Sequence, residues 1–282
     1  MDQSIAISES SAFAEGGSGL RVFYRCWRPG IAPRATLTIV PGFNSHSGYY
    51  AWAGRELAAR GIVVYALDLR GRGRSDGERF YVDSFDDYVA DVALVSAIVA
   101  ERDTGLPHFL LGHSAGGVVS CLYAMQHAET VAGFICESFA FELPAPDFAL
   151  AVLQGLSHLA PHAHVLALKN ADFSRDPQVV EAMNADPLIA HEAQPTKTLA
   201  AIVRADQRLR QQFDKITLPL LILHGSADRA AKPEGSKFFY AHAGATDREL
   251  KLYDGVYHDP LNDKGREQVL DDIAAWLLQR AG

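Results

Sequence analysis

A serine stands at the centre of a Gly-x-Ser-x-Gly motif in the stretch Gly112–Gly116. The apolar run Phe109–Leu111 before it predicts a buried strand, and the small residues after Ser114 begin a predicted helix that reaches about His127. A sharp strand-to-helix turn of this kind presents a serine hydroxyl at the end of a sheet, where it can act as a nucleophile. Glycine is needed on both sides because a side chain there would clash with the neighbouring strand or helix. A glycine-rich turn that happens to hold a serine is the alternative interpretation, and the flanking strand and helix argue against it.

A nucleophilic serine needs a general base, and the base needs a carboxylate that fixes its tautomer. After such an elbow the partners follow in the order carboxylate, then histidine, in loops at the carboxyl ends of later strands. Asp228 directly follows a predicted strand that ends at His224, and His258 directly follows one that ends at Tyr253. We therefore predict that Ser114, Asp228 and His258 form a catalytic triad.

Other residues compete for the roles of carboxylate and base. The predicted carboxylate could itself be an ordinary turn aspartate. Asp254 and Asp259 lie too near the predicted histidine in the sequence to approach its ring in the usual way, so we interpret them as turn or surface residues. His224 ends a strand and is expected to pack beneath the site. His113 occupies the variable position of the motif, so we expect it to point away from the nucleophile and to have a structural role.

The negative charge that develops on an attacked carbonyl oxygen needs two aligned N–H donors. One is predicted to be the backbone N–H of Ala115, the residue after the nucleophile. The other is expected from the loop after the predicted strand Thr36–Val40, where Phe43 is the candidate. The N-terminus of the helix after the serine adds a partial positive charge nearby.

These residues are positioned by an alternation of apolar strands and helices. Strands are predicted near Ile5–Ala12, Leu20–Trp27, Thr36–Val40, Ile62–Leu67, His108–Leu111, Val131–Cys136, Leu218–Gly225 and Glu249–Tyr253. Helices are predicted at about Tyr49–Arg60, Phe85–Arg102, Ala115–His127, Pro233–His242 and Lys264–Gln279. Strands separated by helices run parallel, so the pattern predicts an α/β fold with a mostly parallel sheet and helices on both faces.

The alternation stops in residues 138–213, which contain several prolines, no clear strand and a mostly helical pattern. We interpret this stretch as an inserted helical cap on a core made of residues 1–137 and 214–282. Apolar residues in the cap could line an acyl-binding site or touch a lipid surface, although their helical spacing equally favours core packing. The candidates for substrate contact are Phe139, Phe141, Phe148 and Leu153.

Composition argues against several classes of protein. The 282 residues carry a formal net charge of -8 and contain no basic stripe, which argues against a nucleic-acid partner. The odd number of cysteines and their apolar or helical contexts indicate buried thiols in a reducing compartment; they are Cys26, Cys121 and Cys136. Neither a charged leader nor an apolar run of the roughly 18 to 20 residues that a membrane span needs is visible, so a cytoplasmic location is expected.

Three histidines in the predicted cap invite a metal interpretation: His158, His162 and His164. Pro161 interrupts them, and no cysteine or clear carboxylate partner accompanies them. We therefore expect no metal. Serine, histidine and aspartate chemistry of the predicted kind also requires no cofactor.

Taken together, the motifs resemble the monoacylglycerol lipase and lysophospholipase branch of the α/β-hydrolases, sometimes grouped with serine aminopeptidases. The resemblance runs over nearly the whole chain and rests on Ser47–Tyr50, Asp68–Ser75, Tyr81–Phe85, Gly112–Gly116, Ser174–Pro177, Asp186–Leu188, His224–Asp228 and Tyr253–Gly255 leading to His258. It implies an α/β-hydrolase fold without a cofactor. It also implies that Ser114, Asp228 and His258 are the triad and that Phe43 and Ala115 form the oxyanion hole.

The chain departs from this family at two places. The family usually has His-Gly at the start of the oxyanion loop, where its histidine supports the loop, and this chain has Pro41 and Gly42. The family often has glutamate after the catalytic histidine, and this chain has Asp259, from which we expect little chemical consequence.

The resemblance implies a serine esterase that hydrolyses single-acyl lipid esters, such as monoacylglycerols or lysophospholipids, with possible transient contact between the cap and a membrane surface. An amidase or aminopeptidase with the same triad is one alternative. It would need cap carboxylates to hold a substrate amine, and those available form no compelling pattern: Glu142, Asp147 and Asp172. A ligand-binding receptor with little turnover is the other. The oligomeric state stays open.

Overall fold

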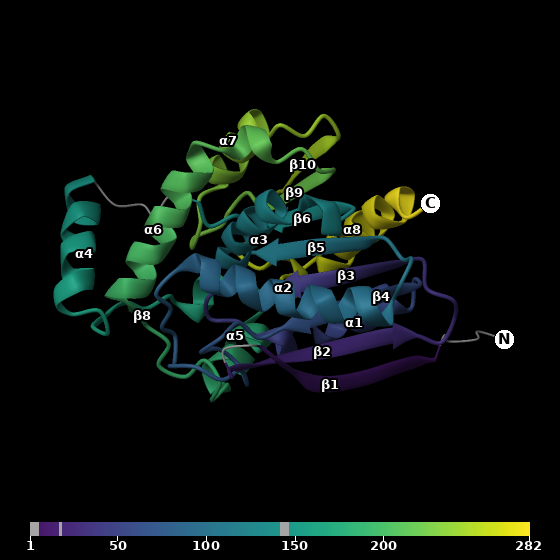
Figure 1. Ribbon diagram of the computed structural model, residues 1–282, viewed down its shortest axis with the longest axis horizontal. Helices are drawn as coiled ribbons and strands as arrows, with labels where there is room; N and C mark the ends of the chain where they lie inside the picture. Colours follow the sequence, from purple (N-terminus) through teal and green to yellow (C-terminus); the bar gives the residue numbers. More distant parts are fainter. Residues whose placement is uncertain (1–5, 17–18, 142–146) are drawn as a thin grey trace.

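The computed structural model describes residues 6–16, 19–141 and 147–282, with only the backbone described for residues 147–151. Eight strands form one sheet in the order β1-β2-β4-β3-β5-β6-β9-β10 (Figure 1). Their bounds are Ile7–Glu15 for β1, Arg21–Pro29 for β2, Ala35–Val40 for β3, Ile62–Leu67 for β4, His108–His113 for β5, Gly133–Glu137 for β6, Leu220–Gly225 for β9 and Arg248–Tyr253 for β10. Strand β2 runs antiparallel to both of its neighbours, and the pairs from β4 to β10 are parallel. The predicted mostly parallel sheet is confirmed.

Helices cover both faces of this sheet, as predicted. On one face lie α1 (Ala51–Ala58) and α8 (Arg266–Arg280), which share a buried cluster with the sheet that includes Trp27 and Trp276. On the other face lie α2 (Phe85–Arg102), α3 (Ala115–Gln126) and α7 (Pro233–His242). The central strands β3, β4, β5, β6 and β9 are buried along their whole length, because helices exclude water from both sides.

Short 3-10 turns complete several connections in the core. They are η1 (Ser47–Tyr50), η2 (Ala128–Thr130), η4 (Phe213–Lys215) and η5 (Pro260–Asn262). The helix predicted from Tyr49 therefore begins as η1, because the ring of His46 accepts the N–H of Gly48 at 3.0 Å and caps that turn. The three cysteines are buried and free, as expected.

Residues 138–213, which we call the cap segment, leave the sheet after β6 and return toward β9. Their described elements are α4 (Asp147–Leu159), β7 (His164–Leu166), η3 (Asn170–Asp172), α5 (Pro177–Ala185), β8 (Gln194–Pro195) and α6 (Thr196–Arg210). The sequence showed no clear strand here, yet β7 and β8 pair antiparallel. Helix α6 packs against α3 and adds Ile202, Ala205 and Leu209 to the buried core, whereas α4 packs on α6 away from the sheet (Figure 1).

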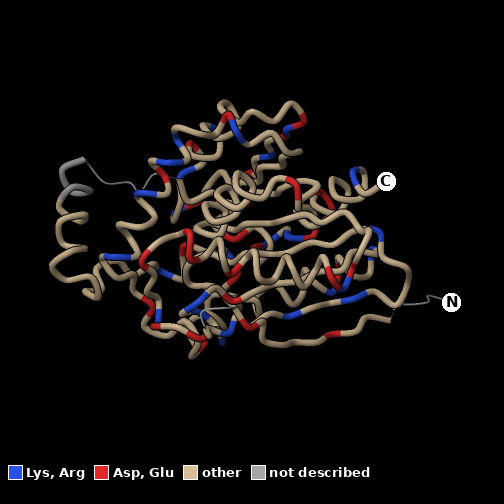
Figure 2. The backbone as a smooth tube through the Cα atoms, in the orientation of Figure 1, with Lys and Arg blue, Asp and Glu red and all other residues tan. Residues whose placement is uncertain are grey.

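Charged residues of both signs are interspersed along the sheet and its helices (Figure 2). Helix α4 differs, since the described side chains from Val152 to Leu159 include no Asp, Glu, Lys or Arg. Among the helices of the described ranges, none combines the length and the apolar character that a membrane crossing requires.

Candidate active site

Ser114 lies at the sharp turn between β5 and α3. Its backbone has φ of 54° and ψ of -121°, a conformation that non-glycine residues avoid and that costs about 1–3 kcal/mol. A Cβ atom at Gly112 would lie 2.5 Å from the carbonyl oxygen of Gly116, and one at Gly116 would lie 2.1 Å from that of Val40. Both contacts are with backbone, so only glycine allows the turn to form against its neighbours.

His258 joins Ser114 to Asp228 through hydrogen bonds at both ring nitrogens. His258 Nε2 lies 2.9 Å from Ser114 Oγ, and His258 Nδ1 lies 2.7 Å from Asp228 Oδ2. The side chains of Asp228 and His258 are almost fully buried. A neutral ring that donates from Nδ1 to Asp228 has a free lone pair on Nε2, which can accept the serine proton.

Two adjacent strands bring the acid and the base together. In the parallel pair of β9 and β10, Gly225 stands opposite Tyr253, so both strands end at the same edge of the sheet. The loop after β9 carries Asp228, and the loop after β10 carries His258. The N–H of Ser226 donates to the carbonyl of Tyr253 at 2.8 Å, which ties one loop to the other.

Asp228 accepts hydrogen bonds at both carboxylate oxygens. Its Oδ1 accepts the backbone N–H groups of Ala230 at 2.8 Å and of Ala231 at 2.9 Å. Burial alone would raise the pKa of Asp228, but the charge of His258 and the hydrogen bonds from His224 and His258 hold that pKa well below its usual range. The carboxylate is therefore ionised at neutral pH and can stabilise a protonated His258.

His224 contributes more to the site than packing beneath it. Its Nε2 lies 3.0 Å from Asp228 Oδ2, so that oxygen accepts from two histidine rings. Its Nδ1 lies 2.7 Å from the hydroxyl of Ser236 on α7. The ring thus links Asp228 to α7, and the only sequence signal for this contact is the spacing of four residues between His224 and Asp228.

The loop after β3 passes directly over the serine. A Cβ atom at Gly42 would lie 2.8 Å from Ser114 Cβ and 3.3 Å from the backbone nitrogen of Ala115. Within the described part of the chain, neither the N–H of Phe43 nor that of Ala115 donates to a protein acceptor. Two unpaired N–H donors therefore stand on the two segments that meet at Ser114, which is the arrangement an oxyanion hole requires.

Comparison with known proteins identifies the family to which this chain belongs. A family described as "Serine aminopeptidase, S33" (Hydrolase_4) matches residues 31–265. The monoacylglycerol lipase of Mycolicibacterium smegmatis is 32% identical over 265 residues, which cover 93% of this chain and 95% of that protein. The monoglyceride lipase of Homo sapiens is 31% identical, with 93% of this chain and 88% of that protein covered. This chain belongs to the Hydrolase_4 family.

A solved structure agrees with this membership. The crystal structure of Paleococcus ferrophilus monoacylglycerol lipase matches with a TM-score of 0.80 at 25% identity, and the match covers 98% of this chain and 99% of that one. The predicted α/β-hydrolase fold is therefore confirmed for this member of the Hydrolase_4 family. The family match begins after β1 and β2 and includes the loops that carry Ser114, Asp228 and His258.

In this Hydrolase_4 member, the described hydrogen-bond partners of the His258 ring are Asp228 and Ser114, and neither alternative aspartate is among them. Asp254 is exposed and accepts the hydroxyl of Ser226 at 3.1 Å, as expected for a turn residue. Asp259 stands at a turn, since its carbonyl accepts the N–H of Asn262 at 2.9 Å, but a surface position is wrong because its side chain is buried. Its Oδ2 accepts the amide of Asn262 at 3.0 Å, while its backbone N–H donates to Phe173.

His113 and Asp259 meet Glu137 beneath the site. His113 has a structural contact, as expected, because its Nε2 donates to the backbone carbonyl of His258 at 3.1 Å. One nitrogen or oxygen from each of the three residues lies within 4.8 Å of the others. Burial and the charge of Asp259 raise the pKa of Glu137 well above its usual range. Burial beside Asp259 therefore favours the protonated form of Glu137 over a second buried carboxylate.

The apolar candidates of the cap segment divide into three groups. Phe139 and Phe141 are buried, and their rings stack on each other with centroids 5.4 Å apart, which favours core packing, one of the two roles that the sequence left open. Leu153 is half-buried on α4. The side chain of Phe148 lies outside the described residues. Of the cap histidines, His162 pairs with Glu78 at 2.7 Å.

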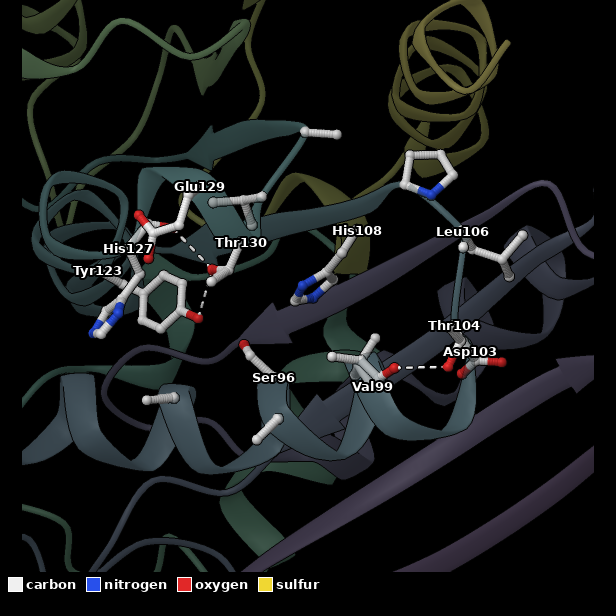
Figure 3. Close-up of a pocket in the computed structure, with 17 residues that line it drawn as sticks. Ser96, Val99, Asp103, Thr104, Leu106, His108, Tyr123, His127, Glu129 and Thr130 are labelled. Carbon is white, nitrogen blue, oxygen red and sulfur yellow. Dashed lines mark hydrogen bonds between the residues drawn. The ribbon is translucent and has the colours of Figure 1, made fainter.

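A cavity of about 670 Å³ lies at the opposite end of β5 from the serine (Figure 3). Figure 3 shows Ser96 of α2 and His108 of β5 pointing toward the same space. Burial lowers the pKa of His108 to about 4, and its Nε2 lies 2.9 Å from the hydroxyl of Thr38. The length of β5 separates this cavity from Ser114, so the cavity does not adjoin the predicted triad.

Proposed function

We propose that this protein hydrolyses esters of single acyl chains, monoacylglycerols above all, with Ser114 as the nucleophile, His258 as the general base and Asp228 as the orienting carboxylate. The observation that carries the proposal is the hydrogen-bonded sequence from Ser114 Oγ through His258 to Asp228, in a chain whose relatives include named monoacylglycerol lipases. As a member of their family, the protein is a serine ester hydrolase.

The geometry supports a two-step reaction. Ser114 Oγ attacks the acyl carbonyl carbon while His258 Nε2 takes the hydroxyl proton, and Asp228 stabilises the imidazolium that results. The N–H groups of Phe43 and Ala115 bind the oxyanion. The alcohol leaves with the proton from Nε2, and the acyl group remains on Ser114. Water then gives a proton to the same nitrogen as it attacks the acyl-enzyme. That proton passes to Ser114 Oγ as the ester bond breaks and the acid is released.

We further propose that the cap segment covers the acyl chain and touches the lipid surface that supplies it. Helix α4 and strand β7 expose apolar side chains with no charged residue among them: Val152, Leu156, Leu159 and Val165. The exposed fraction of Leu159 is 85%, an arrangement that suits an interface with lipid better than contact with water alone.

The alternatives have less support. An aminopeptidase needs a carboxylate that holds the substrate amine, and the relatives from Mycolicibacterium smegmatis and Homo sapiens are named as lipases rather than as peptidases. A pure receptor has no need for a serine whose strained backbone is aligned with a histidine and an aspartate.

Turnover of p-nitrophenyl esters from acetate to palmitate tests the proposal, with monoacylglycerol as the natural ester and Ser114→Ala as the inactive control. We expect a maximum at medium or long chains, no turnover by Ser114→Ala, and covalent labelling of Ser114 by a fluorophosphonate. A maximum at acetate would contradict the proposed acyl-chain site. Labelling together with cleavage of aminoacyl amides alone would favour the peptidase, and absence of labelling would favour the receptor.

A further inference from the structure

The loop that carries the oxyanion donor Phe43 is anchored to the cap segment. The next residue, Asn44, has φ of 50°, and its backbone N–H donates to Glu192 Oε1 at 3.0 Å. The side-chain amide of Asn44 donates to Asn170 Oδ1 at 3.0 Å. Both acceptors belong to the cap segment, so a backbone group one residue from the oxyanion donor depends on the cap for its partner.

Glu192 is held in place by a buried ion pair. Arg72, in the loop after β4, pairs with Glu192, and the two side chains are only 2% and 1% exposed. Arg72 Nη2 donates to Gln194 Oε1 at 2.8 Å, and Gln194 Nε2 donates back to Glu192 Oε1 at 2.7 Å. Arg72 Nε donates to the hydroxyl of Tyr88 on α2 at 3.1 Å. A charged network with this many partners has one favoured geometry.

The same arginine covers the ring of Phe43. The Arg72 guanidinium carbon lies 4.2 Å from the centroid of that ring. On the other side of Phe43, Gly42 lies against Ser114. Three contacts thus hold Phe43 in place. Arg72 lies over its ring, Glu192 accepts the N–H of the next residue, and the residue before it, Gly42, packs against Ser114. This support stands in a loop that begins with Pro41 and Gly42.

We infer that Glu192 and Arg72 are positioning residues of the oxyanion hole, and that the hole is complete only while the cap segment is docked on the loop after β3. Neither residue touches the substrate. Glu192 directs the Asn44 amide and Arg72 directs the Phe43 ring, and together they aim the N–H of Phe43 at the oxyanion. This inference rests on the proposed ester hydrolysis and assigns part of its transition-state stabilisation to a residue of the cap.

The test compares Glu192→Gln with wild type and with Glu78→Gln. The control makes the same chemical change at another contact between core and cap, where Glu78 pairs with His162 at 2.7 Å and touches no part of the loop. We expect Glu192→Gln to lower kcat about 10- to 100-fold with little change in KM, because loss of one aligned donor costs up to about 10²–10³ in kcat. Glu78→Gln should stay within about threefold of wild type, as a surface pair contributes little.

Inhibitor binding separates positioning from a purely structural role. A long-chain trifluoromethyl ketone forms a tetrahedral oxyanion on the serine, whereas a primary alcohol with the same alkyl chain does not. Glu192→Gln should weaken the binding of the ketone by about the same factor as it lowers kcat. The affinity for the alcohol should stay unchanged, since only the ketone places an oxyanion in the hole. The inference would be overturned if the variant lost the same affinity for both inhibitors. It would also be overturned if a folded variant kept wild-type kcat and wild-type affinity for both.

A second variant covers the case in which Glu192→Gln does not fold. Arg72→Lys keeps a positive charge beside Glu192 but removes the planar group over Phe43, and the same split between ketone and alcohol is expected. Failure of the proposed function is recognised separately, because wild type itself would then show neither ester turnover nor fluorophosphonate labelling. An active wild type with an unaffected Arg72→Lys variant would overturn only the inference about the loop.

Discussion

Replacing Asp228 by asparagine should inactivate the enzyme through the tautomer of His258. Asparagine has one acceptor oxygen and one NH2 group where aspartate has two acceptors. The N–H groups of Ala230 and Ala231, at 2.8 and 2.9 Å from Oδ1, are fixed in the backbone and keep the amide oxygen at that position. The NH2 group must then take the position of Oδ2 and face His258 Nδ1, which lies 2.7 Å away.

A ring that accepts at Nδ1 carries its proton on Nε2, the nitrogen 2.9 Å from Ser114 Oγ. It can no longer remove the serine proton. In the opposite orientation of the amide, its NH2 group would face the two backbone N–H donors. Rotation of the amide therefore does not restore the original tautomer of His258. By analogy with other triads, kcat should fall about 10⁴-fold, equivalent to about 5.5 kcal/mol of transition-state stabilisation.

The assay is hydrolysis of the best ester of the chain-length series at pH 7, with unfolding monitored to show that the variant is folded. Asp254→Asn is the matched control, because it makes the same substitution in the neighbouring loop at a carboxylate that contacts Ser226 and not the base. We expect the control to stay within about threefold of wild type. Retention of more than a tenth of wild-type kcat by Asp228→Asn, or a large loss in Asp254→Asn, would refute the assignment of the carboxylate.

Three further changes test other parts of the structure. Gly42→Ala places a Cβ 2.8 Å from Ser114 Cβ, so the loop must shift and kcat should fall about 10²-fold in a folded protein; an unchanged kcat would contradict the close packing. His108 stays neutral in the fold because burial lowers its pKa to about 4, so wild type should lose about 3 kcal/mol of unfolding free energy as pH falls from 6.5 through 4. Urea unfolding at pH 7 and 4.5 should show that His108→Gln loses less unfolding free energy between these pH values than wild type does. Equal losses would show that His108 is not the cause. Burial raises the pKa of Glu137, so the unfolded chain releases its proton first and wild type loses stability as pH rises above about 4.5. Glu137→Gln lacks this loss and should gain relative to wild type between pH 5 and 8; a constant difference would show that Glu137 is ionised in the fold.

Local sequence patterns predict the strands of the sheet. They also predict that Ser114, Asp228 and His258 lie in loops at one edge of it. The glycines around Ser114 are required by backbone contacts within a few ångström. Asp228 follows the apolar strand β9, and His258 follows β10, in which Leu250 and Leu252 alternate with charged residues. Because parallel strands end at a common edge, the loops after β5, β9 and β10 are expected at the same edge of the sheet.

Features that depend on distant partners could not be predicted in this way. Asp259 is polar and follows a turn, and only the packing of the cap segment at Phe173 shows that it is buried. The bond between Glu192 and Asn44 joins residues 148 positions apart and leaves no periodic signal. Strands β7 and β8 contain three and two residues, too few for alternation to appear.

Helix α6 has two structural roles, and this has a consequence for how substrate range can change. Parallel neighbours such as β6 and β9 must be joined by a crossover, and α6 supplies it by packing on α3 with Ile202 and Leu209 in the core. Helix α4 packs on α6, and it supplies neither the crossover nor the Glu192 contact with the loop after β3. We therefore expect changes of acyl specificity to accumulate in α4, while α6 and the segment that carries Glu192 stay constrained by their contacts with the core.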